Sequence, residues 1–168
     1  MKVVDAIQRE KYGVLDVGRS TLEFLALANE TGADYCVMIG TIPAGGCVTL
    51  HRHPDRESFF LLSGALEVLD YRGDSFEWLT VKPSEFVHIS SPVKHAWRNN
   101  SSDPAVTLMT TTSKLGRFFQ EIGRPANPGA PLSSPTPDDL QHLMRLAAKY
   151  EYWIGSAAEN AAFGVSLP

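Results

Sequence analysis

The sequence predicts an all-β fold, an antiparallel β-sandwich or barrel followed by a short helical extension at the C-terminus. Two observations support this fold class. Between residues 22 and 112, short apolar or alternating runs are separated about every 8 to 12 residues by turn-forming residues. Beyond residue 112 the pattern changes, first to a proline-rich segment and then to an apolar stripe with helical spacing.

The length and composition are those of one globular domain. The chain has 168 residues, of which 43% are hydrophobic and 20% charged, so we expect a single main hydrophobic core. We divide it into an N-terminal arm (1–21), a barrel (22–112) and a C-terminal strap and helix that pack on the barrel (113–168).

Nine runs in the barrel region are expected to be strands, because each is apolar or alternates between apolar and polar residues. The residues between them are rich in Gly, Pro, Asn, Asp and Ser, which fix φ or tolerate positive φ and are rare inside strands. No run requires a helix. The expected strands are residues 22–27, 35–42, 47–53, 58–62, 66–71, 76–81, 86–89, 94–98 and 106–111.

The C-terminal region predicts a strap and a helix. Residues 123–137 contain five prolines and no periodicity, which favours an extended surface segment. A helix should follow, with Thr136 as N-cap, Pro137 at the first helical position and Gly155 as its end. The apolar stripe that should pack on the barrel consists of Leu140, Leu143, Ala147 and Tyr150.

Charge and cysteine content exclude several classes of partner. The net charge is −4 and no Lys/Arg cluster is present, so we expect no nucleic acid partner. Residues 1–13 carry charges that do not fit a signal peptide, and no apolar run is long enough to span a membrane, so we expect a cytoplasmic protein without a membrane partner. Cys36 and Cys47 lack a CxxC spacing and are expected to be reduced thiols.

The segment from Gly45 to Gly64 contains the residue types of a metal site. Side chains two apart on a strand face the same way, so His51 and His53 should present two imidazoles on one face. After a turn, Glu57 opens the next strand, and antiparallel pairing should bring its carboxylate beside the two histidines. Polar groups buried in a small core without partners are costly, which favours a shared metal ion.

A later strand offers a fourth ligand. His95, Trp97 and Asn99 share one face of the strand expected at 94–98. Three imidazoles and one carboxylate suit a divalent transition metal ion and leave coordination positions open.

On these residues the chain resembles the cupin superfamily, whose two motifs are G(x)5HxH(x)3-4E(x)6G and G(x)5PxG(x)2H(x)3N. The second motif is matched at His95 and Asn99. Its Gly, Pro and Gly are replaced by Ser84, Ser90 and Pro92, which affects turn residues and no ligand. The first motif is matched at every specified position by Gly45, His51, His53, Glu57 and Gly64.

The resemblance covers about residues 22–112 and implies a double-stranded β-helix, the jelly-roll barrel of cupins. The tail from residue 116 also resembles single-domain cupins similar to quercetin dioxygenase. The implied cofactor is one divalent transition metal ion, with Fe(II) favoured and Ni, Mn, Zn and Cu left open. Its implied ligands are His51, His53, Glu57 and His95.

Four further residues are candidates for a substrate pocket. Phe59 and Trp97 share strand parity with ligands and would line the cavity, as core aromatics or as a substrate platform. His88 is either a pocket donor or a structural or surface histidine. Phe119, with Phe118 and the final helix, forms either a lid or a structural cap.

Our leading hypothesis is a dioxygenase-like oxygenase of a small enolisable or aromatic hydroxy compound, in which substrate oxygen binds the metal and Glu57 is the catalytic base. The alternatives are a non-redox isomerase, decarboxylase or cyclase that uses the ion as a Lewis acid, and a small-molecule-binding cupin without turnover. We also expect a homodimer, because barrel-edge strands and the N-terminal arm need covering.

Overall fold

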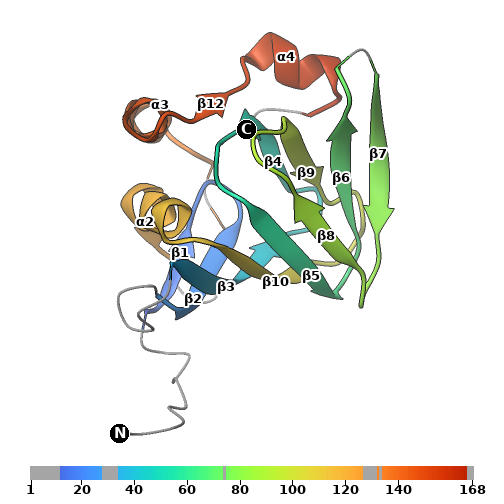
Figure 1. The fold of residues 1–168 in the computed structure, drawn as a ribbon, viewed down its shortest axis with the longest axis horizontal. Helices are drawn as coiled ribbons and strands as arrows, with labels where there is room; N and C mark the ends of the chain where they lie inside the picture. Colours follow the sequence, from blue (N-terminus) through green and yellow to red (C-terminus); the bar gives the residue numbers. More distant parts are fainter. Residues whose placement is uncertain (1–11, 28–33, 74, 127–131, 133, 166–168) are drawn as a thin grey trace, which may run out of the picture.

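The computed structural model describes residues 12–27, 34–73, 75–126, 132 and 134–165, and Figure 1 labels most of their elements. The helices are α2 (Ser113–Ile122), α3 (Pro137–Tyr150) and α4 (Ala157–Ala162). The strands are β1 (Val14–Asp16), β2 (Thr21–Ala26), β3 (Tyr35–Ile42), β4 (Cys47–Arg52), β5 (Glu57–Ser63), β6 (Leu66–Tyr71), β7 (Phe76–Val81), β8 (Phe86–Ile89), β9 (His95–Arg98), β10 (Ala105–Thr112), β11 (Arg124–Pro125) and β12 (Trp153–Ile154).

The strands form two antiparallel sheets, which confirms the predicted fold class. One sheet has seven strands in the order β11-β1-β2-β3-β10-β5-β8, and the other has five in the order β12-β4-β9-β6-β7. All nine expected runs are strands, and four of them match from end to end: β3, β6, β7 and β8. Within the described part of 22–112 there is no helix, as expected.

Apolar side chains of both sheets meet in the barrel interior and form its core. One cluster joins the inner faces of β5, β6, β8 and β9, the end of β7 and the start of β10. At the other end, α2 packs on β2, β3 and β10 and α3 packs on α2, and Figure 1 shows α2 beside β1. The first cluster consists of Leu61, Leu66, Val68, Val81, Ile89, Trp97 and Ala105.

The helix α2 begins where β10 ends, and the sequence did not predict it. Thr112 is both the last residue of β10 and the N-cap, since its hydroxyl accepts a hydrogen bond from the Leu115 N–H at 3.2 Å. Gly116 lets the helix lie close to β3, because a Cβ at this position would be 2.6 Å from Cys36 Sγ. Cys36 and Cys47 do not form a disulfide in the structure.

The helix α3 begins as predicted but ends earlier. The Thr136 side chain accepts from the Asp139 N–H, and the two residues form a capping box. Glu151 adopts φ 63° and ends the helix at Tyr150, so the prediction of Gly155 as its end is wrong. The Tyr152 N–H then bonds the Ala147 carbonyl at 2.8 Å, a C-terminal cap that satisfies a free carbonyl without glycine.

Other C-terminal and N-terminal predictions are corrected or lie outside the description. Leu140, predicted in the packed stripe of α3, is 44% exposed, and Leu146 takes its place in the buried face. Part of the predicted strap, residues 127–131 and 133, lies outside the described residues, as do residues 1–11 of the predicted arm. No described helix is both long enough and apolar enough to cross a membrane.

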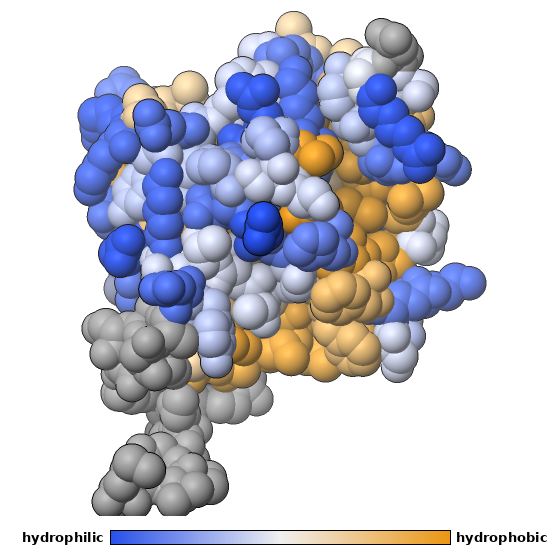
Figure 2. Space-filling model, in the orientation of Figure 1, coloured by the Kyte–Doolittle hydropathy of each residue, from blue (hydrophilic) through white to orange (hydrophobic). Residues whose placement is uncertain are grey.

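The outer face of the seven-stranded sheet carries an apolar row. Strand register aligns Ile39, Leu108, Phe60 and Phe86 across β3, β10, β5 and β8. Phe60 is 37% exposed and Phe86 64% exposed. Figure 2 shows hydrophobic surface gathered over this side of the molecule.

Candidate metal centre

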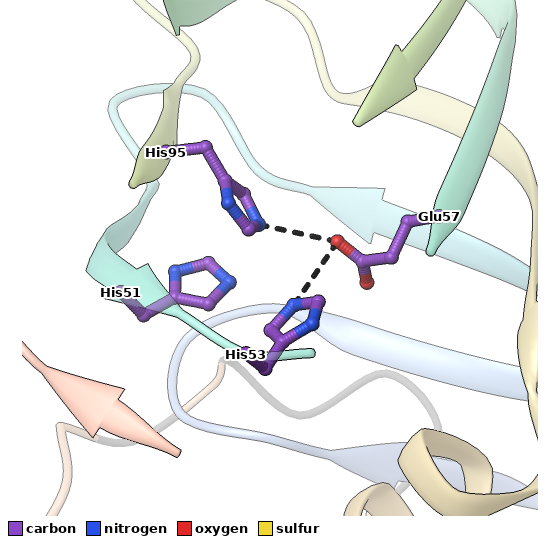
Figure 3. A group of neighbouring side chains, drawn as sticks. All are labelled: His51, His53, Glu57 and His95. Atoms are coloured by element: carbon purple, nitrogen blue, oxygen red, sulfur yellow. Dashed lines mark hydrogen bonds and ion pairs between the residues drawn. The ribbon is translucent and has the colours of Figure 1, made fainter. Parts of the chain in front are cut away.

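Three strands bring together the four residues predicted as metal ligands, as Figure 3 shows. His51 lies near the end of β4, with His53 just beyond it, while Glu57 opens β5 and His95 opens β9. His51 and His95 are directly opposite each other in the β4–β9 pair. One ligand atom from each of the four residues lies within 4.8 Å of all the others. The group could therefore hold one metal ion.

Each imidazole is oriented by the backbone. In all three rings Nδ1 faces a carbonyl oxygen two residues away, which can only accept a hydrogen bond. The proton therefore resides on Nδ1, and the lone pair of Nε2 is directed at the centre of the group, as in metal-bound histidines. The contacts are His51 to Thr49 (2.7 Å), His53 to Asp55 (3.0 Å) and His95 to Val93 (2.9 Å).

The donor set fits a divalent cation. Glu57 Oε2 lies 3.2 Å from His95 Nε2 and 3.4 Å from His53 Nε2. With the protons on Nδ1, these three atoms present lone pairs to one another, and His53 Nε2 is buried without a hydrogen-bond partner. A shared cation satisfies all of them, and imidazole nitrogen with one carboxylate is a ligand set for Fe, Mn, Ni, Cu or Zn.

The electrostatics of His51 and Glu57 suit ligation at neutral pH. Burial, reinforced by the neighbouring rings of His95 and His53, lowers the pKa of His51 to about 3, so this ring is neutral. Burial would also lower the pKa of His53, but the nearby Glu57 carboxylate outweighs it and raises that pKa. Burial favours a protonated Glu57, yet the two imidazoles hold its pKa well below the usual range, so it is a carboxylate.

The turn between β4 and β5 contains a functional candidate that the sequence reasoning missed. Asp55 lies between His53 and Glu57, is 5% exposed, and accepts hydrogen bonds from the hydroxyls of Thr112 and Tyr152. An acidic residue in a polar turn usually faces solvent, so the sequence contained no local sign that this one is buried.

Asn99, predicted on the same face as His95, holds a turn. Its side chain is fully buried, and Nδ2 donates to the carbonyls of Ile42 at 3.0 Å and Asp103 at 2.9 Å. Its backbone N–H also donates to the Gly46 carbonyl at 2.8 Å. Asn99 thus fixes the ends of β9 and β4 relative to each other.

A cavity of about 160 Å³ borders the candidate metal centre. His51 and Glu57 lie in its wall, and most of the remaining wall is apolar. Phe59, Trp97 and Phe119, three of the four residues predicted to line a pocket, border this cavity, and the rings of Phe59 and Trp97 lie 4.6 Å apart. Both sheets and the helices α2 and α3 contribute to the wall, so the C-terminal helices enclose the site.

His88, the fourth pocket candidate, lies outside the cavity, so the pocket role is corrected and the alternative of a surface histidine agrees with the structure. It is exposed on β8, where its Nδ1 lies 3.0 Å from the Ser58 hydroxyl. Phe86 on the same face is 64% exposed, while Ile89 on the opposite face is buried. Phe86 belongs to the apolar outer row, so the face of β8 that it shares with His88 points away from the cavity.

Comparisons with known proteins identify the barrel. Residues 38–111 match the family described as Cupin_2, cupin domain. No curated protein matches the chain. Among solved structures, the Cupin_2 domain of an XRE family transcriptional regulator from Enterobacter cloacae is 25% identical with a TM-score of 0.46, and the match covers 56% of this chain and 96% of that chain.

Two oxalate decarboxylases are similar in fold. The enzyme of Bacillus subtilis, studied for its Mn(II) centres, is 17% identical with a TM-score of 0.53, and the match covers 61% of this chain and 28% of that chain. The formate complex of the Lactobacillus farciminis enzyme is 15% identical with a TM-score of 0.53, covering 60% of this chain and 31% of that chain. The present chain thus spans less than a third of either decarboxylase.

Proposed function

Because the chain carries a cupin domain and belongs to the cupin superfamily, we propose that it is a metal-dependent enzyme whose substrate is a small, mainly apolar compound with an enolic or aromatic hydroxyl. The observation that carries this proposal is the convergence of three imidazoles and one carboxylate beside an apolar cavity. A divalent ion held by these residues would act as a Lewis acid, and a redox-active one such as Fe(II) would also provide electrons for O₂ chemistry.

Glu57 is the proposed catalytic base, and its electrostatics limit the proton it can take. Its lowered pKa makes it a carboxylate at neutral pH but a weak proton acceptor. It therefore serves a hydroxyl that is already acidic, such as an enol or a phenol, and does not serve a simple alcohol. Since Glu57 Oε2 contacts His53 and His95, the carboxylate is also held in a fixed position for this transfer.

The cavity defines the rest of the substrate. Among its described lining residues, the only titratable side chains are His51 and Glu57, and the other polar groups are mainly hydroxyls such as those of Thr41 and Thr107. A carboxylate on the part of the substrate that lies away from the metal would meet no cationic side chain in the cavity wall, and it would be costly to bury. The volume is close to that of a cavity of about 150 Å³ that binds benzene. We therefore propose an uncharged body of about one ring.

Oxygenase chemistry is our proposal for the reaction class, because apolar walls admit O₂ and the reaction needs a single base. The test is turnover of small 1,3-diketones and catechols by metal-loaded protein, with and without O₂, with oxalate as the charged comparison. We expect O₂ uptake that matches substrate loss, and no reaction with oxalate. Turnover with Zn in the absence of O₂ would show a non-redox isomerase, decarboxylase or cyclase instead.

The metal ligands are tested separately from the reaction. We expect purified wild-type protein to contain metal in stoichiometric amount by elemental analysis, and His51→Ala and Glu57→Ala to lose it. His88→Ala is the matched control, because it removes an exposed imidazole outside the cavity. Stoichiometric metal in both His51→Ala and Glu57→Ala would show that the ligands are assigned wrongly.

A further inference from the structure

We propose that Tyr152, which lies in the C-terminal extension, positions the metal ligands His53 and Glu57 through the buried side chain of Asp55. This inference rests on the proposed metal site but not on the proposed reaction. It makes the C-terminal extension part of the metal centre, although none of its residues is a ligand.

The contacts of Asp55 place it between the two ligands in structure as well as in sequence. Its backbone oxygen faces His53 Nδ1 at 3.0 Å and so sets the orientation of that ring. Its side chain accepts hydrogen bonds from the Tyr152 hydroxyl at 2.5 Å, to Oδ2, and from the Thr112 hydroxyl, to Oδ1. A displacement of Asp55 therefore moves the acceptor that orients His53, and strains the short turn that ends at Glu57.

Among the described residues, the hydrogen bonds that anchor this turn come from two sides. On one side lie the last residues of β10, where Thr111 Oγ1 donates to the Arg56 carbonyl at 2.9 Å and Thr112 bonds Asp55. β10 pairs with β5, so these anchors belong to the sheet that carries Glu57. Tyr152 is the anchor from the other side, 97 residues along the chain from Asp55.

Tyr152 is itself fixed relative to the strand that carries His51. The two residues after it form β12, which pairs with β4 and places Ile154 opposite His51. The Tyr152 ring is 7% exposed and packs 4.9 Å from the Phe118 ring and 5.4 Å from the His53 ring. The hydroxyl of Tyr152 thus links the β4 side of the centre to the turn that precedes Glu57.

Tyr152→Phe tests the link, because it removes the hydroxyl and keeps the ring. Tyr150→Phe is the matched control, since the Tyr150 hydroxyl also donates to a carboxylate, Glu121 Oε1 at 2.6 Å, and its ring packs in the same cluster. The full-length protein is stripped of metal and titrated with Co(II) against a chelator of known affinity. The visible absorption of bound Co(II) reports its coordination geometry.

We expect Tyr152→Phe to weaken Co(II) binding about 10- to 100-fold, the usual effect of removing a partner that orients a ligand, and to alter the Co(II) spectrum. Tyr150→Phe should keep the wild-type affinity and spectrum. Thermal unfolding of both metal-free variants measures the general loss of stability, which we expect to be similar for the two. An equal change of affinity in both variants, or none in Tyr152→Phe, would overturn the positioning role.

Asp55→Ala tests the same link from its other end. It keeps the backbone oxygen that faces His53 but removes both carboxylate oxygens that accept from Tyr152 and Thr112. We expect a loss of Co(II) affinity at least as large as that of Tyr152→Phe and little further loss in the double variant. Full additivity would overturn the link. If wild-type protein did not bind Co(II) at all, the proposed metal site itself would be wrong.

Discussion

The orientation of each imidazole in the centre is determined by a carbonyl oxygen two residues away along its own chain segment. The tautomer of the three rings therefore follows from local strand and turn geometry. Groups held in this way by the backbone do not have to reorganise when an ion binds. Backbone carbonyls can therefore hold the site at strand ends, and no disulfide is present among the described residues.

Binding of metal should weaken as pH falls, because protons compete for His53. The pKa of this ring is raised in the metal-free protein by Glu57, so Nε2 takes up a proton as pH falls through that raised value. His51, with a pKa of about 3, and Glu57, with a lowered pKa, do not titrate near neutral pH. We expect the affinity for Co(II) to fall as the pH is lowered through the raised pKa of His53.

The stability of the metal-free protein should have the opposite pH dependence. A raised folded-state pKa at His53 contributes stability that is fully present below the unfolded pKa of about 6.5 and is lost as pH rises through the folded value. Urea unfolding at several pH values, with and without Co(II), measures both slopes. If neither the affinity for Co(II) nor the free energy of unfolding changed with pH, the assignment of the titrating proton to His53 would be wrong.

The ligands were predictable from the sequence, but the residues that support them were not. His51, His53 and Glu57 are separated by spacings that strand periodicity and one turn convert directly into proximity. Asp55 and Tyr152 meet across 97 residues, and no local pattern encodes such a contact.

At the scale of elements, strands were predicted well because turn chemistry marks their ends in the sequence. The helix α2 was missed because β10 continues into it without a Gly or Pro, and Thr112 serves both as the last strand residue and as N-cap. The strands β11 and β12 have two residues each, which is too short for a periodicity to be seen.

The helix α4 should stabilise the strand that carries His51. Asn160 is fully buried, and its Oδ1 accepts from the Leu50 N–H at 2.7 Å while its Nδ2 donates to the carbonyls of Gly155 and Ser156. Asn160→Ala leaves these buried groups unpaired, so we expect a loss of about 1–3 kcal/mol in the free energy of unfolding in urea.

Asn100→Ala is the control for this variant. Asn100 is exposed and bonds Glu67 at 2.7 Å, and its removal should change the free energy of unfolding by less than about 0.5 kcal/mol. Equal effects of the two substitutions would mean that Asn160 does not couple α4 to β4.

At the scale of the whole molecule, the two ends of the interior differ in structure. One end is a packed apolar core, and the other is the cavity whose wall includes residues of α2 and α3. The sequence suggested a barrel with an added tail, since the two parts differ in pattern. Which face the tail would cover depends on packing between distant segments, so it could not be read from that pattern.

The homodimer expected from the sequence remains a prediction, and the apolar row on the outer sheet face offers a surface for it. Exposed apolar patches of this kind are typical of protein interfaces. We expect light scattering to give twice the chain mass, and Phe60→Asp to give a monomer. Leu79→Asp, on the other sheet and 39% exposed, should remain dimeric. A monomeric wild-type protein would contradict the prediction.

The pairing of β12 with β4 has a consequence for the solution behaviour of the chain. Without β12 the second sheet would have four strands with β4 at its edge, and the backbone of His51 and Arg52 would lose its partner strand. Open edges of this kind recruit strands from other chains and promote aggregation. The short strand β12 therefore protects this edge from pairing with strands of other chains. Chains cleaved before Trp153 should lose solubility.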